Sequence, residues 1–155
     1  MLMKKIFLCL LPALLMLSYG VYGAAGNVFQ EYAKVIFINQ PRQVGVAYEN
    51  GKKVREFPVL TGDDEATTDP GIYVIRWKVP DYHSRKYDTP MPFSLFFDMR
   101  HRKAIHEGGV PAGPERKEVA THGCIHVEPP HIEWLYDWAE EGATAVVISG
   151  ERSGD

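Results

Sequence analysis

The chain has 155 residues, of which 45% are hydrophobic and 24% are charged, and its formal net charge is −3. This length suits one domain with a substantial core, and the composition is too apolar for a disordered chain. Lys and Arg do not exceed Asp and Glu, so there is no electrostatic reason to expect binding to nucleic acid or anionic lipid. We therefore expect one packed domain that binds neither partner.

The first residues have the pattern of a secretory signal peptide. Two lysines precede the apolar stretch 6–17, and small residues follow around Gly23 and Ala25. The stretch is shorter than the roughly 20 apolar residues that a permanent membrane-spanning helix requires. We expect residues 1–25 to be cleaved on export, which predicts a periplasmic or cell-wall-facing protein with no stable membrane insertion. Cleavage after Gly23 or after Ala25 fits equally well, and an uncleaved anchor is the alternative.

The rest of the chain has the pattern of strands separated by turns. Asn50-Gly51 is a strong hairpin signal, because both central residues of a type I′ turn need a positive φ. Residues 80–92 are expected to form a long loop whose aromatic and polar side chains either line a cleft or cover the core. The predicted strands are rich in β-branched and aromatic residues and cover 34–39, 43–48, 54–60, 72–79, 93–98, 103–106 and 143–149.

One segment has the pattern of a helix. Pro129 and Pro130 stand at its start, apolar residues recur on one face, and Gly142 follows its last turn. The sequence therefore predicts a mostly β domain over residues 33–149 with one prominent C-terminal helix. Residues 150–155 are expected to form a flexible tail.

Cys124 gives the first indication of function. Cys9 would leave with the leader, so Cys124 would stand alone in an oxidising compartment, where it has no internal disulfide partner. Such a residue can be a small buried hydrophobe. Here, however, His122 and His126 flank it, and His106 ends a predicted strand. A histidine within hydrogen-bond reach is the usual means of activating a thiol.

These residue types permit two chemistries besides simple packing. In acyl transfer, the Cys124 thiolate attacks an amide carbonyl and a histidine relays the proton, while the backbone N–H groups of Gly123 and Cys124 stabilise the oxyanion. In a metal site, three imidazoles and one thiolate would bind zinc. The residue types alone leave acyl transfer, metal binding and plain packing open. The four ligands of the metal site would be His106, His122, Cys124 and His126.

The spacing of these residues resembles the signature of the L,D-transpeptidase (YkuD-type) catalytic domain. His106 precedes Thr121-His122-Gly123-Cys124 by an interval of 14 residues. The resemblance covers residues 33–149 and implies a β-sandwich-like catalytic domain. It extends to the segments Thr61-Gly62, Thr68-Asp69-Pro70-Gly71 and Met91-Pro92-Phe93, and to the final helix and strand.

The resemblance implies a cysteine enzyme of the bacterial cell wall that needs no cofactor or metal. Such domains attack the bond after the third residue of a peptidoglycan stem peptide, usually a meso-diaminopimelate centre. The acyl group then passes to the amine of another stem, to an outer-membrane lipoprotein or to water. Carried over by position, Cys124 is the nucleophile, His106 is the general base and acid, and His122 shapes the site. Gly123 and Cys124 would form the oxyanion hole, and Thr121 would contact the substrate.

Two residues depart from the family pattern. Members commonly have Arg, sometimes Asn, two residues after the cysteine, where this chain has His126. An always-charged group is thereby replaced by one that is largely neutral near pH 7, so His126 is expected to change substrate recognition or to confer a pH response. Glu107 replaces a small residue and is expected either to orient His106 or to face solvent.

The leading hypothesis from the sequence is a secreted L,D-transpeptidase. The alternative is an L,D-carboxypeptidase or another hydrolase of the same bonds, which would form the same acyl-enzyme but transfer the acyl group to water. A non-catalytic wall-binding or zinc-binding module is the alternative of another class.

Overall fold

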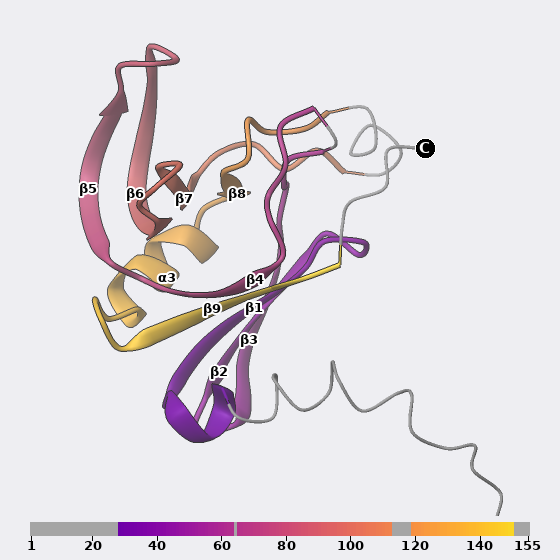
Figure 1. The fold of residues 1–155 in the computed structure, drawn as a ribbon, viewed down its shortest axis with the longest axis vertical. Helices are drawn as coiled ribbons and strands as arrows, with labels where there is room; N and C mark the ends of the chain where they lie inside the picture. Colours follow the sequence, from indigo (N-terminus) through magenta and orange to yellow (C-terminus); the bar gives the residue numbers. More distant parts are fainter. Residues whose placement is uncertain (1–27, 64, 113–118, 151–155) are drawn as a thin grey trace, which may run out of the picture.

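The computed structural model describes residues 28–63, 65–112 and 119–150, and in this part of the chain two β-sheets face each other (Figure 1). The expected mostly β, sandwich-like fold is confirmed. The predicted signal peptide and all but the first residue of the predicted tail lie outside the described residues. One sheet has the order β3-β2-β1-β9-β4, with β1 (Lys34–Asn39), β2 (Val44–Glu49), β3 (Lys52–Pro58), β4 (Gly71–Val74) and β9 (Thr144–Ser149). The other has the order β5-β6-β7-β8, with β5 (Trp77–Ser84), β6 (Thr89–Asp98), β7 (Lys103–Glu107) and β8 (Ile125–Val127).

Strand β1 is the centre of the five-stranded sheet. It pairs antiparallel with β2 and parallel with β9. Val35 and Ile36 are both fully buried although they point to opposite faces, as a central strand covered on both sides requires. The predicted turn at Asn50-Gly51 is confirmed, since their φ angles are +50° and +73°.

The predicted strand over residues 72–79 is in fact two strands. β4 belongs to the first sheet and β5 to the second, and the short connection between them carries the chain from one sheet to the other (Figure 1). Ile75 lies in this connection and is fully buried. Because the connecting residue is itself buried, the apolar pattern in the sequence continues from β4 into β5 although the two strands belong to different sheets.

The predicted long loop over residues 80–92 is wrong, because β5 and β6 form an antiparallel hairpin there. β5 is an edge strand, where a proline removes no hydrogen bond from a neighbour on its open side. Pro80 and Phe93 fall out of the pairing register at the same point, and Phe93 has a φ of +54°. Pro90 and Pro92 lie in the part of β6 that extends beyond its pairing with β7.

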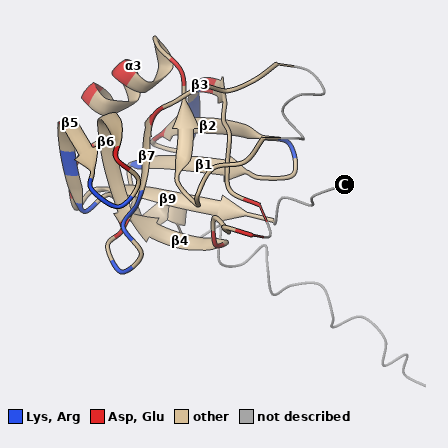
Figure 2. Ribbon diagram, turned by 90° about the horizontal axis from the view of Figure 1, so that it is seen from above, with Lys and Arg blue, Asp and Glu red and all other residues tan. Residues whose placement is uncertain are grey.

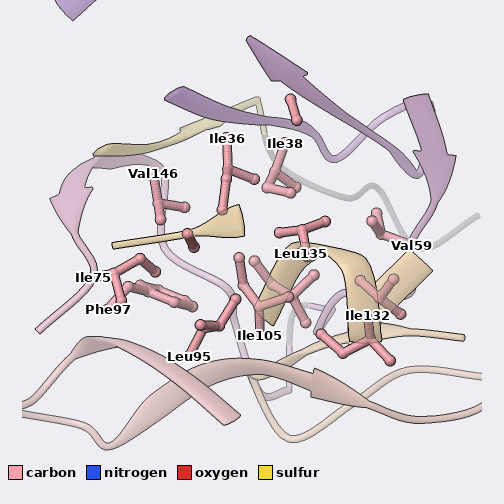
Figure 3. Packing of buried hydrophobic residues seen from close by; sticks show 14 of the residues in the cluster. Ile36, Ile38, Val59, Ile75, Leu95, Phe97, Ile105, Ile132, Leu135 and Val146 are labelled. Atoms are coloured by element: carbon pink, nitrogen blue, oxygen red, sulfur yellow. The ribbon is translucent and has the colours of Figure 1, made fainter. Parts of the chain in front are cut away.

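The core lies between the two sheets. Figure 3 shows Ile36, Ile38 and Val146 of the first sheet above Leu95 and Ile105 of the second. All five side chains are buried, and each such aliphatic side chain contributes about 1.5–3 kcal/mol to stability. This packing fixes the distance between the sheets and thus the position of β7 and β8.

Helix α3 (His131–Trp138) confirms the predicted C-terminal helix. It follows Pro130 and places Ile132 and Leu135 in the same core (Figure 3). This one-sided burial explains the helical spacing of apolar residues in the sequence. In the described part of the chain, no helix has the length and apolar character needed to cross a membrane.

Strand β8 is held from both sides. On one side it pairs in parallel with β7, which places His126 opposite His106. On the other side, the N–H and C=O of His126 exchange hydrogen bonds with Leu60 at 2.8 and 3.1 Å. A second bridge, Gly62 to Thr121, holds the segment before Cys124. The fold therefore fixes the chain on both sides of the cysteine.

Candidate active site

Cys124 lies directly before β8 and is about half buried. Its side chain packs against a cluster that contains Met91, Phe96 and Ala104. Burial raises the pKa of the Cys124 thiol, while a hydrogen bond from the Ala104 backbone and the charge of Lys103 act in the opposite direction. Burial has the larger effect, so the resting cysteine is a protonated thiol.

His106 is buried in β7, with 5% of its surface exposed. Its Nδ1–H donates to the backbone carbonyl of Glu107 at 2.7 Å, which leaves Nε2 as the acceptor. Burial and, to a smaller extent, the neighbouring His126 lower the pKa of His106 to about 4. His106 is thus a neutral imidazole whose orientation is fixed by a backbone bond. Glu107 orients it through this carbonyl, and its carboxylate makes no ion pair with any described residue.

His126 stands beside His106, with ring centroids 4.8 Å apart in an edge-to-face arrangement. Burial lowers the pKa of His126, and a hydrogen bond to the Gly109 backbone opposes this. The ring lies against Gly108, where an added Cβ would come within 2.5 Å of ring atom Cγ. The glycine therefore makes room for an imidazole at this position, and His126 is held as a second neutral ring.

The loop before Cys124 turns sharply at Gly123, whose φ is +96°. The Gly123 N–H donates to the Thr121 hydroxyl oxygen at 3.1 Å, and this hydroxyl donates to the Cys124 carbonyl. The Gly123 carbonyl accepts a hydrogen bond from the Thr68 hydroxyl at 3.0 Å. The Thr68 oxygen accepts in turn from the N–H of Gly62 at 2.9 Å. Two threonine hydroxyls thus hold the loop in its shape.

These bonds bear on two of the predicted roles. Thr121 is buried and its hydroxyl serves the loop itself. Of the two N–H groups predicted for the oxyanion hole, that of Gly123 already donates within the loop. The backbone N–H of Cys124 is therefore the remaining predicted donor.

His122 lies apart from the two other histidines. An extended chain over residues 122–126 would place His122 on the same side as Cys124, but β8 begins only at Ile125 and Gly123 turns the chain. His122 is exposed and stacks on Tyr87 of the β5–β6 hairpin, with ring centroids 4.6 Å apart. The sequence showed that residues 80–92 are rich in aromatic side chains, but it predicted a loop there. The stacking depends on the β5–β6 hairpin, which was not predicted.

Cys124 lines two cavities, which share Ser84, Tyr87, Met91, His122 and Cys124 itself. The first has a volume of about 350 Å³, and His106, His126 and Thr121 lie in its wall. The second has a volume of about 380 Å³, and its further lining includes Arg85, Lys86, Arg102 and Lys103. Cys124 therefore faces a neutral cavity that contains His106 and a cationic cavity that does not.

The predicted zinc ligands do not converge. Among the described residues, no three donor atoms from the histidines and the cysteine of this site lie within 4.8 Å of one another, whereas those of Asp69, Asp98 and His101 do. In that second group the Lys103 ammonium already lies 2.5 Å from an Asp69 carboxylate oxygen. The site around Cys124 has a thiol and a neutral base at one cavity, which is the arrangement that acyl transfer requires.

Residues 33–148 match the YkuD family, described as the L,D-transpeptidase catalytic domain. The chain belongs to this family. Over 111 residues it is 28% identical to L,D-transpeptidase 2 of Mycobacterium tuberculosis, and this match covers 64% of the chain and 27% of that relative. The chain thus spans about a quarter of the length of the curated relative that it matches.

Two solved structures illustrate the shared fold. An L,D-transpeptidase from Stackebrandtia nassauensis has a TM-score of 0.70 at 23% identity, over 79% of this chain and 58% of that one. The LD transpeptidase LdtMt1, solved in complex with imipenem, has a TM-score of 0.65 at 16% identity, over 76% and 59%. At these identities the likeness concerns the fold of the L,D-transpeptidase domain. It confirms the expected two-sheet architecture.

Gly123→Ala should lower the stability of the domain by more than the positive φ angle of Gly123 alone would cause. An added Cβ would lie 2.7 Å from the Thr67 carbonyl oxygen. Gly51 also has a positive φ but nothing within 4 Å of an added Cβ, so Gly51→Ala is the matched control. We expect Gly51→Ala to cost about 1–2 kcal/mol and Gly123→Ala clearly more in urea unfolding. Equal losses would show that the Thr67 contact is unimportant.

Burial of neutral His106 should make the domain less stable in acid. Its folded pKa of about 4 lies below the ordinary 6.5, so the unfolded chain takes up this proton first as the pH falls. The stabilisation is complete above pH 6.5 and is lost as the pH falls toward 4, by about 3 kcal/mol. In urea titrations, His106→Gln should lose less stability than the wild type over this range. The exposed control His83→Gln should lose as much stability as the wild type. If the free energy of unfolding had the same dependence on pH in all three proteins, His106 would not be the cause of the acid sensitivity.

Proposed function

We propose that this domain is a secreted cysteine L,D-transpeptidase that acts on peptidoglycan stem peptides through an acyl-enzyme at Cys124. The observation that carries the proposal is the meeting of a protonated thiol and a neutral, backbone-oriented imidazole at one cavity of a chain that belongs to this family. Export rests on the signal-peptide pattern of residues 1–25. An outer-membrane lipoprotein is a further acyl acceptor that the family resemblance suggests.

In the proposed first half-reaction, Nε2 of His106 takes the proton of the Cys124 thiol as the sulfur attacks the amide carbonyl after the third stem residue. The Cys124 N–H stabilises the oxyanion. The C–N bond then breaks, and His106 returns the proton to the leaving amine of the terminal residue. The product is a thioester on Cys124 and a free terminal amino acid.

In the second half-reaction, an amine of another stem attacks the thioester. His106 takes a proton from this amine and returns it to the cysteine sulfur as the C–S bond breaks, so the resting enzyme is restored. The raised thiol pKa and the lowered imidazole pKa keep both groups neutral between turnovers. The charged thiolate and imidazolium are then present together only while the substrate fills the cavity.

A second candidate keeps the acyl-enzyme and changes the acceptor to water. The product would be that of an L,D-carboxypeptidase, or of a hydrolase that detaches lipoprotein from the wall. The neutral His126 in the first cavity favours it, because a neutral ring holds the carboxylate of an acceptor stem less firmly than an arginine fork does. Water needs no such anchor.

Purified protein and disaccharide tetrapeptide, analysed by mass spectrometry, test the reaction directly. We expect a crosslinked dimer or released terminal D-alanine, and neither product with Cys124→Ala. Imipenem should also add its mass to Cys124, as the fold neighbour solved with this compound suggests. A thiol that reacts with an alkylating reagent but forms neither products nor the imipenem adduct would support the non-catalytic alternative, and elemental analysis would then test for bound zinc.

His126→Arg should shift the products from hydrolysis toward crosslinking. The change adds a permanent positive charge to a cavity whose described lining has neither Lys nor Arg. His126→Asn is the control, since it removes the imidazole without adding charge and should leave the product ratio near that of the wild type. The ratio of dimer to hydrolysed tripeptide measures the effect, and an Arg variant with the wild-type ratio would exclude His126 as the determinant of the acceptor.

A further inference from the structure

We propose that the second cavity beside Cys124 is a carboxylate-binding subsite in which Arg85 and Arg102 hold a free carboxylate of the stem peptide. This inference rests on the proposed function and narrows it, because it selects stems whose carboxylates are free over stems in which they are amidated. The two arginines belong to different hairpins, β5–β6 and β6–β7. Both line the cavity that also contains the nucleophile.

The charge of this cavity contrasts with that of the whole chain. The chain carries a net charge of −3, yet the cavity is lined by Arg85, Lys86, Arg102 and Lys103 and, among its described lining residues, by no Asp or Glu. Figure 2 shows several blue segments on the part of the chain around β5, β6 and β7. A cleft lined by one sign of charge raises the local concentration of ligands of the opposite sign. An anionic ligand is therefore the class that this cavity suits.

Two of the four cations already have partners within the described part of the protein. The Lys103 ammonium contacts the Thr67 carbonyl at 2.7 Å and the Asp69 carboxylate at 2.5 Å. Lys86 lies 4.8 Å from the centroid of the Tyr87 ring. In the part of the chain that the structure describes, neither arginine has an ion pair. Arg85 and Arg102 are thus the side chains that remain for a ligand.

The loop that carries Arg102 is held in place by its own hydrogen bonds. The Asp98 carboxylate accepts the backbone N–H groups of Arg100 and His101 at 3.0 and 3.1 Å, and it also contacts the His101 ring at 2.7 Å. Arg102 itself has a φ of +56° at the tight end of this turn. A guanidinium on a fixed turn loses less freedom on binding than one on a loose loop.

The chemistry of the ligand follows from the guanidinium groups and from the reaction. A planar guanidinium donates two parallel hydrogen bonds to a carboxylate, which makes arginine selective for this group. A stem tetrapeptide carries free carboxylates besides the amide that is cut. The first cavity offers them only neutral groups, so a carboxylate next to the scissile bond is better placed on the arginine side of Cys124.

The test compares Arg85→Gln/Arg102→Gln with the control Arg42→Gln/Lys52→Gln, in the same disaccharide tetrapeptide assay. The control removes two exposed positive charges from the other sheet, one in the β1–β2 turn and one at the start of β3, and neither residue lines either cavity. We expect the double arginine variant to raise KM roughly tenfold with little change in kcat, because exposed charges contribute modestly to binding and do not touch the reacting atoms. The control should behave as the wild type.

A second test changes the substrate instead of the protein and uses a stem peptide whose carboxylates are amidated. Its KM should exceed that of the free carboxylate form for the wild type, and the two forms should be nearly equal for the double arginine variant. A higher salt concentration should raise the KM of the wild type for the free carboxylate form and should hardly change the KM of the double arginine variant. Equal KM values of the wild type for both substrates, or an unchanged KM in the variant, would overturn the subsite.

Binding to a Cys124→Ser protein separates this inference from the proposed reaction. Calorimetry with the free and amidated tetrapeptides needs no turnover. Tighter binding of the free form that depends on Arg85 and Arg102 would support the subsite even if the wild type made no product, which would count against transpeptidation alone. Turnover by the wild type without any preference for the free form would refute the subsite alone. Neither turnover nor preferential binding would refute both.

Discussion

The parallel pairing of β7 with β8 is the constraint on which the site depends, since it places His126 and the end of the cysteine loop beside His106. Three residues of strand would be too few to hold this register by themselves. Leu60 supplies the missing support by bonding both backbone groups of His126 from the other side. The core beneath, in which Ile125 and Val127 of β8 are fully buried, then prevents β8 from sliding, because a shift by one residue would turn these side chains out of the core.

Burial has opposite effects on the pKa values of Cys124 and His106, and together these effects define the protonation state of the site. It raises the pKa of the Cys124 thiol and lowers that of His106, so the proton stays on sulfur. A buried thiol is a weaker nucleophile and a poorer target for oxidation than a thiolate. This suits a cysteine that has no disulfide partner among the described residues, in a protein that we propose is exported. In the proposed reaction, the substrate must therefore help to create the ion pair during attack.

The sequence predicted correctly those strands and turns that are determined by residues close together in the chain. β1 and β2 and the turn at Asn50-Gly51 follow from alternation and from turn chemistry. The β5–β6 hairpin was missed because its prolines argue against a strand unless one knows that β5 is an edge. His122 and Tyr87 meet only through that hairpin. The part played by Lys103 depends on contacts with residues about 35 positions away, which no local pattern reveals.

The distribution of charge around Cys124 has an electrostatic logic. A cation near the sulfur favours the thiolate, and Lys103 has this effect on the Cys124 pKa. A cation near His106 would instead oppose uptake of the proton, as the neighbouring His126 already does. Positive side chains in the second cavity and neutral ones in the first therefore both favour the proton transfer from sulfur to imidazole that we propose. A permanent positive charge at the position of His126 would lower the pKa of His106 further, so any gain in holding a substrate carboxylate there would be accompanied by a weaker proton acceptor in the proposed reaction.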